Sequence, residues 1–362
     1  MSLVQVALPI VFAVLKVAAV AGVGWLLWSR RILHDSAIGD ISELVIKAFA
    51  PCLIFANALG ATSLAGIAGP TGLILIAAGP AVLGIGYGLS SVLAKVLRVD
   101  RSDRTAVVVA STFQNQLYLP LALGVSVVPS LFQALLGQGT SVNSAVGAYV
   151  IGLSLFGIGY GPFFWGIGLS WITSDGGPQT FNGFASLLKL IPAPVVGLIV
   201  GFIVALTPLR ALLVPAHAPL RFLVDAATDI GSLTVPLANL VLGAMLARTG
   251  LGVGEPLRNV SIVITSRLIA TPALCLCVLY LARSFWRHSP SASAVAMVVF
   301  IESMSPPATN LAIMSKRSPD TVGGHESRTS EAIPRLLLVA YLLSLIAMPL
   351  WLVLFVRLAQ RW

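Results

Sequence analysis

Long apolar stretches alternate with short polar connections along almost the whole chain of 362 residues. A helix that crosses the hydrocarbon core of a bilayer needs about 20 predominantly apolar residues. We therefore predict an all-α integral membrane protein with ten transmembrane helices. The predicted helices cover residues 3–28, 41–60, 70–95, 105–128, 143–172, 184–207, 219–247, 257–283, 292–315 and 333–358.

The composition excludes a soluble protein and a nucleic-acid partner. Hydrophobic residues make up 57% of the chain and charged residues 10%, whereas a soluble domain carries about 25% charged residues. The net charge is +9, but the 22 Lys and Arg residues are scattered over connections and helix ends instead of clustering with aromatic residues. The expected surroundings are therefore a lipid bilayer.

The positive residues also predict the orientation, because loops on the cytoplasmic side retain Lys and Arg. Arg30 and Arg31 follow the first helix, the connection 60–69 has no charge, and four positive residues lie in 95–104. Continuing this alternation places eleven positive residues inside and six outside. We expect a multi-pass protein of the cell (plasma or cytoplasmic) membrane with both termini extracytoplasmic.

Proline spacing indicates an internal repeat. Five prolines have a partner 185 to 187 residues later, one pair for each helix n and helix n+5. The pairs are Pro9 with Pro194, Pro51 with Pro236, Pro70 with Pro256, Pro120 with Pro307 and Pro162 with Pro349. Because five is odd, the second copy enters the membrane in the opposite direction, as in many secondary transporters. We predict a first repeat at 1–175, a short cytoplasmic linker at 176–183 and a second, inverted repeat at 184–362.

Polar residues and prolines interrupt the fourth and ninth predicted helices at corresponding positions, 113–120 and 300–310. Proline removes a backbone donor, and unpaired backbone at membrane depth is tolerated only where protein or a water-filled cavity satisfies it. Paired breaks of this kind indicate a transport site; kinks used only for packing are the alternative. The candidate substrate-binding residues are Gln114, Asn115, Gln116, Tyr118, Pro120, Pro306, Pro307, Thr309 and Asn310.

A small organic anion is the substrate class that these residues favour. Half-helices that begin at a break present amide ends with about half a positive charge, and side-chain amides donate to carboxylates. Export of one negative charge from a cell with a negative interior is favourable by about 2.3 kcal/mol per 100 mV. Such export could therefore run without a coupling ion.

Glu302 is a tentative coupling residue, because an ionisable residue at membrane depth is costly and functional by default. The carboxyl group is protonated, or paired with a cation such as Arg267, or binds a Na⁺ or H⁺ that travels with the substrate. No other cofactor is expected, and Cys52, Cys275 and Cys277 are interpreted as buried hydrophobes instead of metal ligands.

The broken segments resemble those of a known family. Residues 115–121 are similar to the Asn-x-Gly-Asn/Tyr-Leu-Pro-Leu signature of the auxin efflux carrier family, and residues 307–310 resemble that family's break in helix nine. Residues 47–55 and 235–247 resemble its second and seventh helices. The family belongs to the bile acid, arsenite and riboflavin transporter superfamily, in which a glutamate of helix nine ligates sodium in the bile acid symporters.

This resemblance implies a secondary transporter of an auxin-like or other mono- or dicarboxylate that works by alternating access. Helices four and nine are then expected to cross near the membrane midplane, with a scaffold from helices 1, 2, 6 and 7 and a transport bundle from helices 3–5 and 8–10. The family alone also suggests a homodimer.

A passive channel and a membrane-embedded enzyme are the competing functions. All four histidines fall in predicted connections, which argues against an intramembrane Ser-His protease or a bis-histidine haem site. Asp225 and Asp229 form half of the metal-binding pattern of membrane prenyltransferases, but the other acidic pair, Asp100 and Asp103, is predicted on the opposite side. An enzyme is therefore not expected.

Pairs of glycines four residues apart predict close approach between helices. Three such pairs occur within predicted spans. They are Gly84 with Gly88, Gly157 with Gly161 and Gly197 with Gly201.

Overall fold

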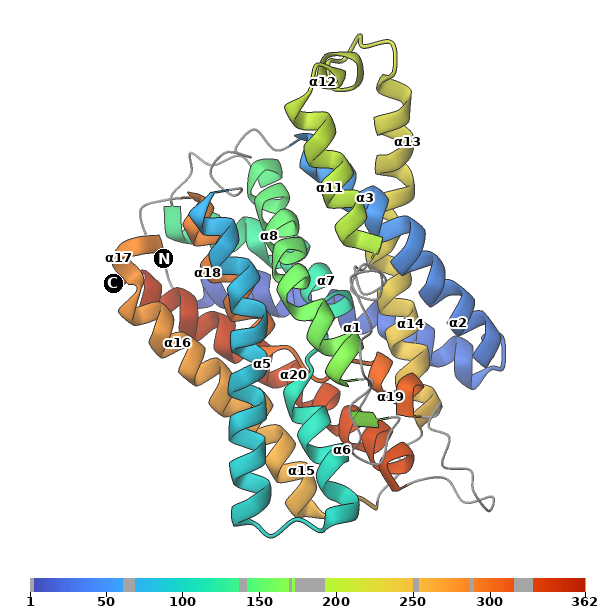
Figure 1. Ribbon diagram of the computed structural model, residues 1–362, viewed down its shortest axis with the longest axis vertical. Helices are drawn as coiled ribbons and strands as arrows, with labels where there is room; N and C mark the ends of the chain where they lie inside the picture. The colour runs from blue at the N-terminus through green and yellow to red at the C-terminus, as the bar shows by residue number, and fades with distance from the viewer. Residues whose placement is uncertain are drawn as a thin grey trace.

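The computed structural model describes residues 3–60, 69–136, 142–168, 171–172, 193–249, 254–286, 290–315 and 328–361. Within these ranges every regular element is a helix, and the one strand-like pairing is a single bridge between Gln114 and Pro307 (Figure 1). The all-α prediction is confirmed for the described part of the chain. The predicted linker at 176–183 lies outside the described residues.

Several predicted spans consist of two or three consecutive helical segments. The helical segments of the first half are α1 (Leu3–Ser29), α2 (Asp35–Leu44), η1 (Val45–Phe49), α3 (Ala50–Gly60), α5 (Pro70–Val96), α6 (Arg101–Thr112), α7 (Tyr118–Leu136), α8 (Val142–Pro162) and η2 (Phe163–Gly168). In the second half they are α11 (Ala193–Leu206), α12 (Leu209–Leu213), α13 (Arg221–Ser232), α14 (Thr234–Thr249), α15 (Leu257–Val263), η3 (Ile264–Ala270), α16 (Thr271–Leu281), α17 (Arg283–Trp286), α18 (Pro290–Met304), α19 (Asn310–Ser315) and α20 (Arg328–Ala359). The segments named η are short π-helices.

Five described helical stretches are long and apolar enough to cross a membrane. They are Pro70–Val96, Ala145–Pro162, Arg221–Arg248, Leu257–Leu281 and Ala332–Ala359. Four shorter apolar helices accompany them, at Leu15–Ser29, Leu119–Pro129, Val195–Leu206 and Ala292–Met304. The second and fourth predicted spans differ most in their bounds, because the helix that begins with α2 starts at Asp35 and the fourth span is divided into α6 and α7.

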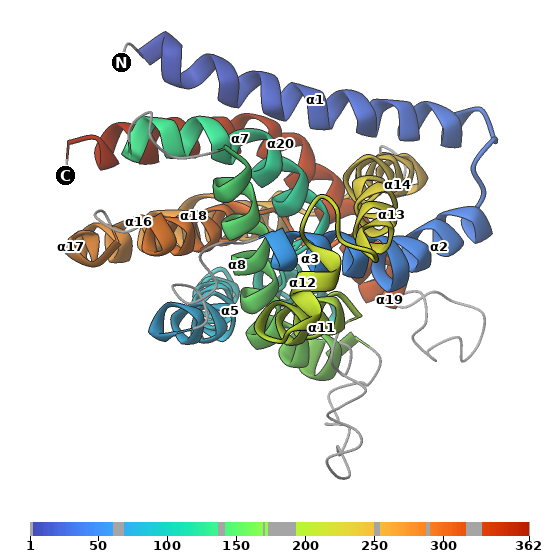
Figure 2. The same cartoon turned by 90° about the horizontal axis from the view of Figure 1, so that it is seen from above.

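The helices fall into two groups, which contact each other where α1 and α14 pack against α7 and α20. In one group α1 packs along α14, and α3 packs against α11 and α13. In the other, α5 packs against α6 and α8, while α18 lies between α8, α16 and α5. Figure 2 shows α1 along one side of the molecule with α7 and α20 next to it. The main buried apolar cluster is built largely from the second group.

Glycines allow the closest helix contacts. A methyl group on Gly197 of α11 would overlap the backbone of Pro51 in α3, and one on Gly201 would lie 2.7 Å from the Cβ of Ala58. The predicted close approach is therefore confirmed for this pair. It is wrong for Gly84 and Gly88, which are exposed on α5 with no described atom within 4 Å of an added methyl group.

These two environments predict opposite effects of the same substitution. Gly197→Ala should lower the melting temperature of the detergent-solubilised protein, because overpacking costs about 1–3 kcal/mol. The matched control Gly84→Ala should leave it unchanged or raise it, since alanine is favoured over glycine in a helix by about 1 kcal/mol. Equal effects of the two substitutions would contradict the packing of α11 on α3.

Candidate functional site

The two predicted breaks lie against each other. Helix α6 ends at Thr112 and α7 begins at Tyr118, while α18 ends at Met304 and α19 begins at Asn310. The amide of Asn115 donates to the carbonyl of Pro306 over 2.8 Å, and the amide of Ala308 donates to the carbonyl of Phe113 over 2.9 Å. Each break therefore supplies partners for backbone groups that the other leaves unpaired, which meets the requirement for irregular backbone in a membrane.

The predicted prolines shape the breaks, and Pro120, Pro306 and Pro307 do not line the cavity beside them. The carbonyl of Pro306 accepts a backbone hydrogen bond, and Pro307 is the bridge partner of Gln114. Pro120 lies in the first turn of α7, where its carbonyl accepts a hydrogen bond of 2.9 Å from the Tyr149 hydroxyl. The side chain of Tyr118 lies outside the described residues.

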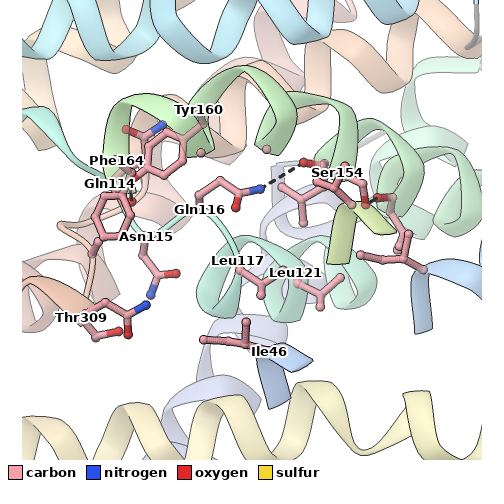
Figure 3. Close-up of a pocket in the computed structure, with 18 residues that line it drawn as sticks. Ile46, Gln114, Asn115, Gln116, Leu117, Leu121, Ser154, Tyr160, Phe164 and Thr309 are labelled. Atoms are coloured by element: carbon pink, nitrogen blue, oxygen red, sulfur yellow. Dashed lines mark hydrogen bonds between the residues drawn. The ribbon is translucent and has the colours of Figure 1, made fainter. Parts of the chain in front are cut away.

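A cavity of about 80 Å³ opens beside the paired breaks. Five of the predicted substrate-binding residues line it, namely Gln114, Asn115, Gln116, Thr309 and Asn310. The rest of the wall is mostly apolar, from Ile46, Ile54, Leu117, Leu121, Val150, Leu153, Ser154, Gly157, Tyr160, Gly161, Phe164, Val195 and Ala308. Figure 3 shows Asn115 and Thr309 close together on one side of the cavity, with Gln116 reaching toward the helix that carries Ser154.

Asn115 connects the cavity to two helices. Its Nδ2 donates to the hydroxyl of Tyr341 in α20 over 2.6 Å, and its Oδ1 accepts from the backbone amide of Leu119 over 3.4 Å. The second contact satisfies an amide in the first turn of α7, as a capping side chain does. Gln116 is held separately, because its Nε2 donates to the carbonyl of Leu153 over 3.1 Å.

A buried arginine stabilises the end of α18. Arg267 of η3 is 0% exposed, and its guanidinium donates to the carbonyls of Ser305 (2.8 Å), Glu302 (2.8 Å) and Ser303 (3.2 Å). A helix leaves its last carbonyls unpaired and carries a partial negative charge at that end, so a cation there is favourable. The sequence suggested an ion pair between Arg267 and the Glu302 carboxylate. That detail is wrong, since the arginine bonds the backbone of this segment.

The Glu302 side chain lies behind the cavity and does not line it. It is 0% exposed, and its Oε2 accepts from Nε2 of Gln114 at 3.4 Å. Gln114 is also 0% exposed and lines the cavity, so it separates Glu302 from any ligand bound there. The structure therefore places the carboxyl group one side chain away from the candidate substrate site.

Three tyrosines support the site and were missed in the sequence. Tyr149 and Tyr160 come from α8, and Tyr341 comes from α20. The Tyr160 hydroxyl donates to the carbonyl of Gln114 over 2.7 Å. The available signal was their occurrence within apolar spans, because a buried tyrosine hydroxyl usually finds a hydrogen-bond partner.

Comparison with known proteins identifies the family of this chain. A family model described as a membrane transport protein matches residues 9–164 and 180–352. Protein PIN-LIKES 7 of Arabidopsis thaliana is 31% identical over 132 residues, which cover 36% of this chain and 33% of the relative. The similarity to that protein thus spans about a third of its length.

The family match confirms the resemblance seen in the broken segments, and it makes the chain a multi-pass membrane transporter. It covers both predicted halves, including each break. The chain belongs to the membrane transport protein family of the auxin efflux carriers.

Proposed function

We propose that this protein is a secondary carrier that moves a small organic anion, a mono- or dicarboxylate, across the cell membrane by alternating access. The observation that carries the proposal is the cavity at the paired breaks. Side-chain amides and a hydroxyl from Asn115, Gln116, Asn310 and Thr309 meet there, and such groups donate to carboxylate oxygens. No described carboxylate lines the cavity, so an anion meets no direct repulsion.

The start of α7 adds to the attraction for an anion. Three successive cavity residues, Asn115 to Leu117, directly precede its first residue, Tyr118. The amino end of this 19-residue helix is therefore next to the cavity, and helix amino ends carry about half a positive charge. An auxin-like acid or another small carboxylate satisfies this arrangement.

We further infer that ten helices form two inverted five-helix repeats. Equivalent prolines occupy equivalent places, since Pro70 is the first residue of α5 and Pro256 precedes the first residue of α15. Pro51 and Pro236 likewise lie in the first turn of α3 and α14. In this arrangement the breaks after α6 and α18 are repeat mates whose segments cross.

We assign the first packing group to the scaffold and the second to the transport bundle that the family resemblance implies. Ile46, Ile54 and Val195 reach the cavity from the scaffold, and its other lining residues come from the bundle. A cavity at such a boundary opens to one side when the groups move relative to each other. At about 80 Å³ it is smaller than the roughly 300–1,000 Å³ of most ligand pockets, so this conformation suits only a small acid.

Counterflow uptake in proteoliposomes against a panel of radiolabelled organic acids tests the function. Asn115→Ala and Asn310→Ala should raise the half-saturating concentration about 10- to 100-fold, because a hydrogen bond to a charged group contributes about 1.5–3 kcal/mol. The matched control is Asn57→Ala, since the Asn57 amide donates to the carbonyl of Leu53 in its own helix and does not line the cavity.

Folding of each variant is checked by its melting temperature. Wild-type half-saturation in folded Asn115→Ala and Asn310→Ala proteins would remove these residues from the site. Flux that rises linearly with concentration and shows no counterflow would identify a channel instead of a carrier.

The orientation is tested independently of the substrate. With both termini outside, a peptide tag at the amino end should be cleaved by protease added to intact cells. A tag inserted after Arg31, in the first connection, should be cleaved only after the membrane is permeabilised. The reverse pattern would invert the proposed topology.

A further inference from the structure

The carbonyl cluster at the end of α18 already holds a cation. Unwound carbonyls and the carboxyl ends of half-helices are the usual ligands of coupling sodium ions in carriers with broken helices. Here the carbonyls of Glu302, Ser303 and Ser305 are bound by the Arg267 guanidinium. Arginine keeps its charge in proteins, and a second cation at the same oxygens would be repelled. A sodium ion therefore has no place in this cluster.

The Glu302 carboxyl group, in contrast, has no ion pair among the described residues. Its one described hydrogen bond comes from Gln114, and its Oε1 has no partner there. Burying an ionised carboxylate without a paired cation is far more costly than burying a neutral acid. This environment favours a bound proton.

The neighbouring amide shows where that proton fits. Oε1 of Gln114 is also buried without a partner among the described residues. When Glu302 is ionised, both unsatisfied atoms are acceptors and cannot bond each other. When it is protonated, its hydroxyl can donate to Oε1 of Gln114 while Nε2 of Gln114 donates to the other carboxyl oxygen. One proton thus satisfies both atoms in a cyclic acid–amide pair.

The other charged and titratable groups around Glu302 leave this pair intact. Tyr149 and Tyr160 of α8 face it, but their hydroxyls donate to the carbonyls of Pro120 and Gln114. Cys275 of α16 faces Ser303 and Arg267. Arg267 is the facing cation, and its Nη1 is also buried without a hydrogen-bond partner among the described residues.

We propose that Glu302 and Gln114 form a proton-binding pair, and that this proton, and not a sodium ion, is the coupling ion of the carrier. The claim that the proton is the coupling ion rests on the proposed function, whereas the claim that Glu302 and Gln114 bind a proton does not depend on it. An ionised Glu302 would repel an anion in the cavity across Gln114, so proton and anion binding strengthen each other reciprocally. Both then move in the same direction, and a monocarboxylate crosses without net charge.

Infrared spectroscopy of the purified protein tests the proton site without any substrate. The wild type at pH 7 should show a carboxylic acid carbonyl band that shifts in D₂O. Glu302→Gln should lack the band and keep its fold, because an amide replaces the neutral acid with the same shape. The matched control Glu43→Gln, which removes an exposed carboxylate paired with Lys47, should keep it. Gln114→Leu should move the band by removing its hydrogen-bond partner, an effect that packing alone would not produce.

Proteoliposome uptake then tests the coupling. A 1:1 symport with a monocarboxylate should accumulate substrate about tenfold for each pH unit of inward proton gradient. Accumulation should be insensitive to membrane potential and to replacement of Na⁺ by K⁺, and Glu302→Gln should lose the pH dependence. Sodium-dependent uptake, or an infrared band that survives in Glu302→Gln, would overturn the proposal.

The two halves of the proposal fail separately. If the carboxylic acid band is present but uptake does not depend on the proton gradient, the coupling is refuted and the proton-binding site is retained. Absence of uptake for every acid would contradict the proposed function, while the infrared result would still decide whether Glu302 carries a proton.

Discussion

The fold depends on satisfying the backbone groups that two broken helices leave unpaired inside a membrane. Each break alone would expose amides and carbonyls to hydrocarbon, where unsatisfied groups cost several kcal/mol each. The chain solves this by laying the breaks together, with Asn115 bonded to Pro306 and Ala308 bonded to Phe113. The candidate site lies beside this junction, where the two halves bring irregular backbone and polar side chains together.

The same contacts connect ligand binding to helix position. The amide of Asn115 lines the cavity and also bonds Tyr341 of α20, and its oxygen caps the start of α7. In the proposed function, a carboxylate that takes a hydrogen bond from this amide shares Nδ2, which has two N–H donors, with Tyr341, so it adds to a contact between two helices. An anion bound in this way would bias the arrangement of the bundle through one side chain, which is the differential interaction that a ligand-driven change requires.

Sequence patterns predicted the helical class, the interruption of the fourth and ninth spans and five residues of the cavity. These predictions succeeded because the length of an apolar stretch and the position of a proline determine the structure of the segment that contains them. The partners of the breaks were harder to predict. Tyr341 meets Asn115 across 226 residues, and the guanidinium of Arg267 bonds carbonyls instead of the nearby carboxylate. Such choices depend on how helices pack, and the exposure of Gly84 shows that a glycine motif alone does not reveal which face is packed.

In the repeat that we propose, the two breaks meet the same need with different chemistry. At the first break, the carbonyl of Gln114 accepts from the neutral hydroxyl of Tyr160. At the second, three carbonyls accept from the charged Arg267, whose repeat position in α5, at the offset of 186 residues between Pro70 and Pro256, is Ala81. The second repeat thus carries a fixed positive charge that the first repeat lacks at the equivalent position. Glu302 lies beside that charge, whereas its repeat mate is the neutral Asn115, so the proposed proton site has no counterpart at the first break.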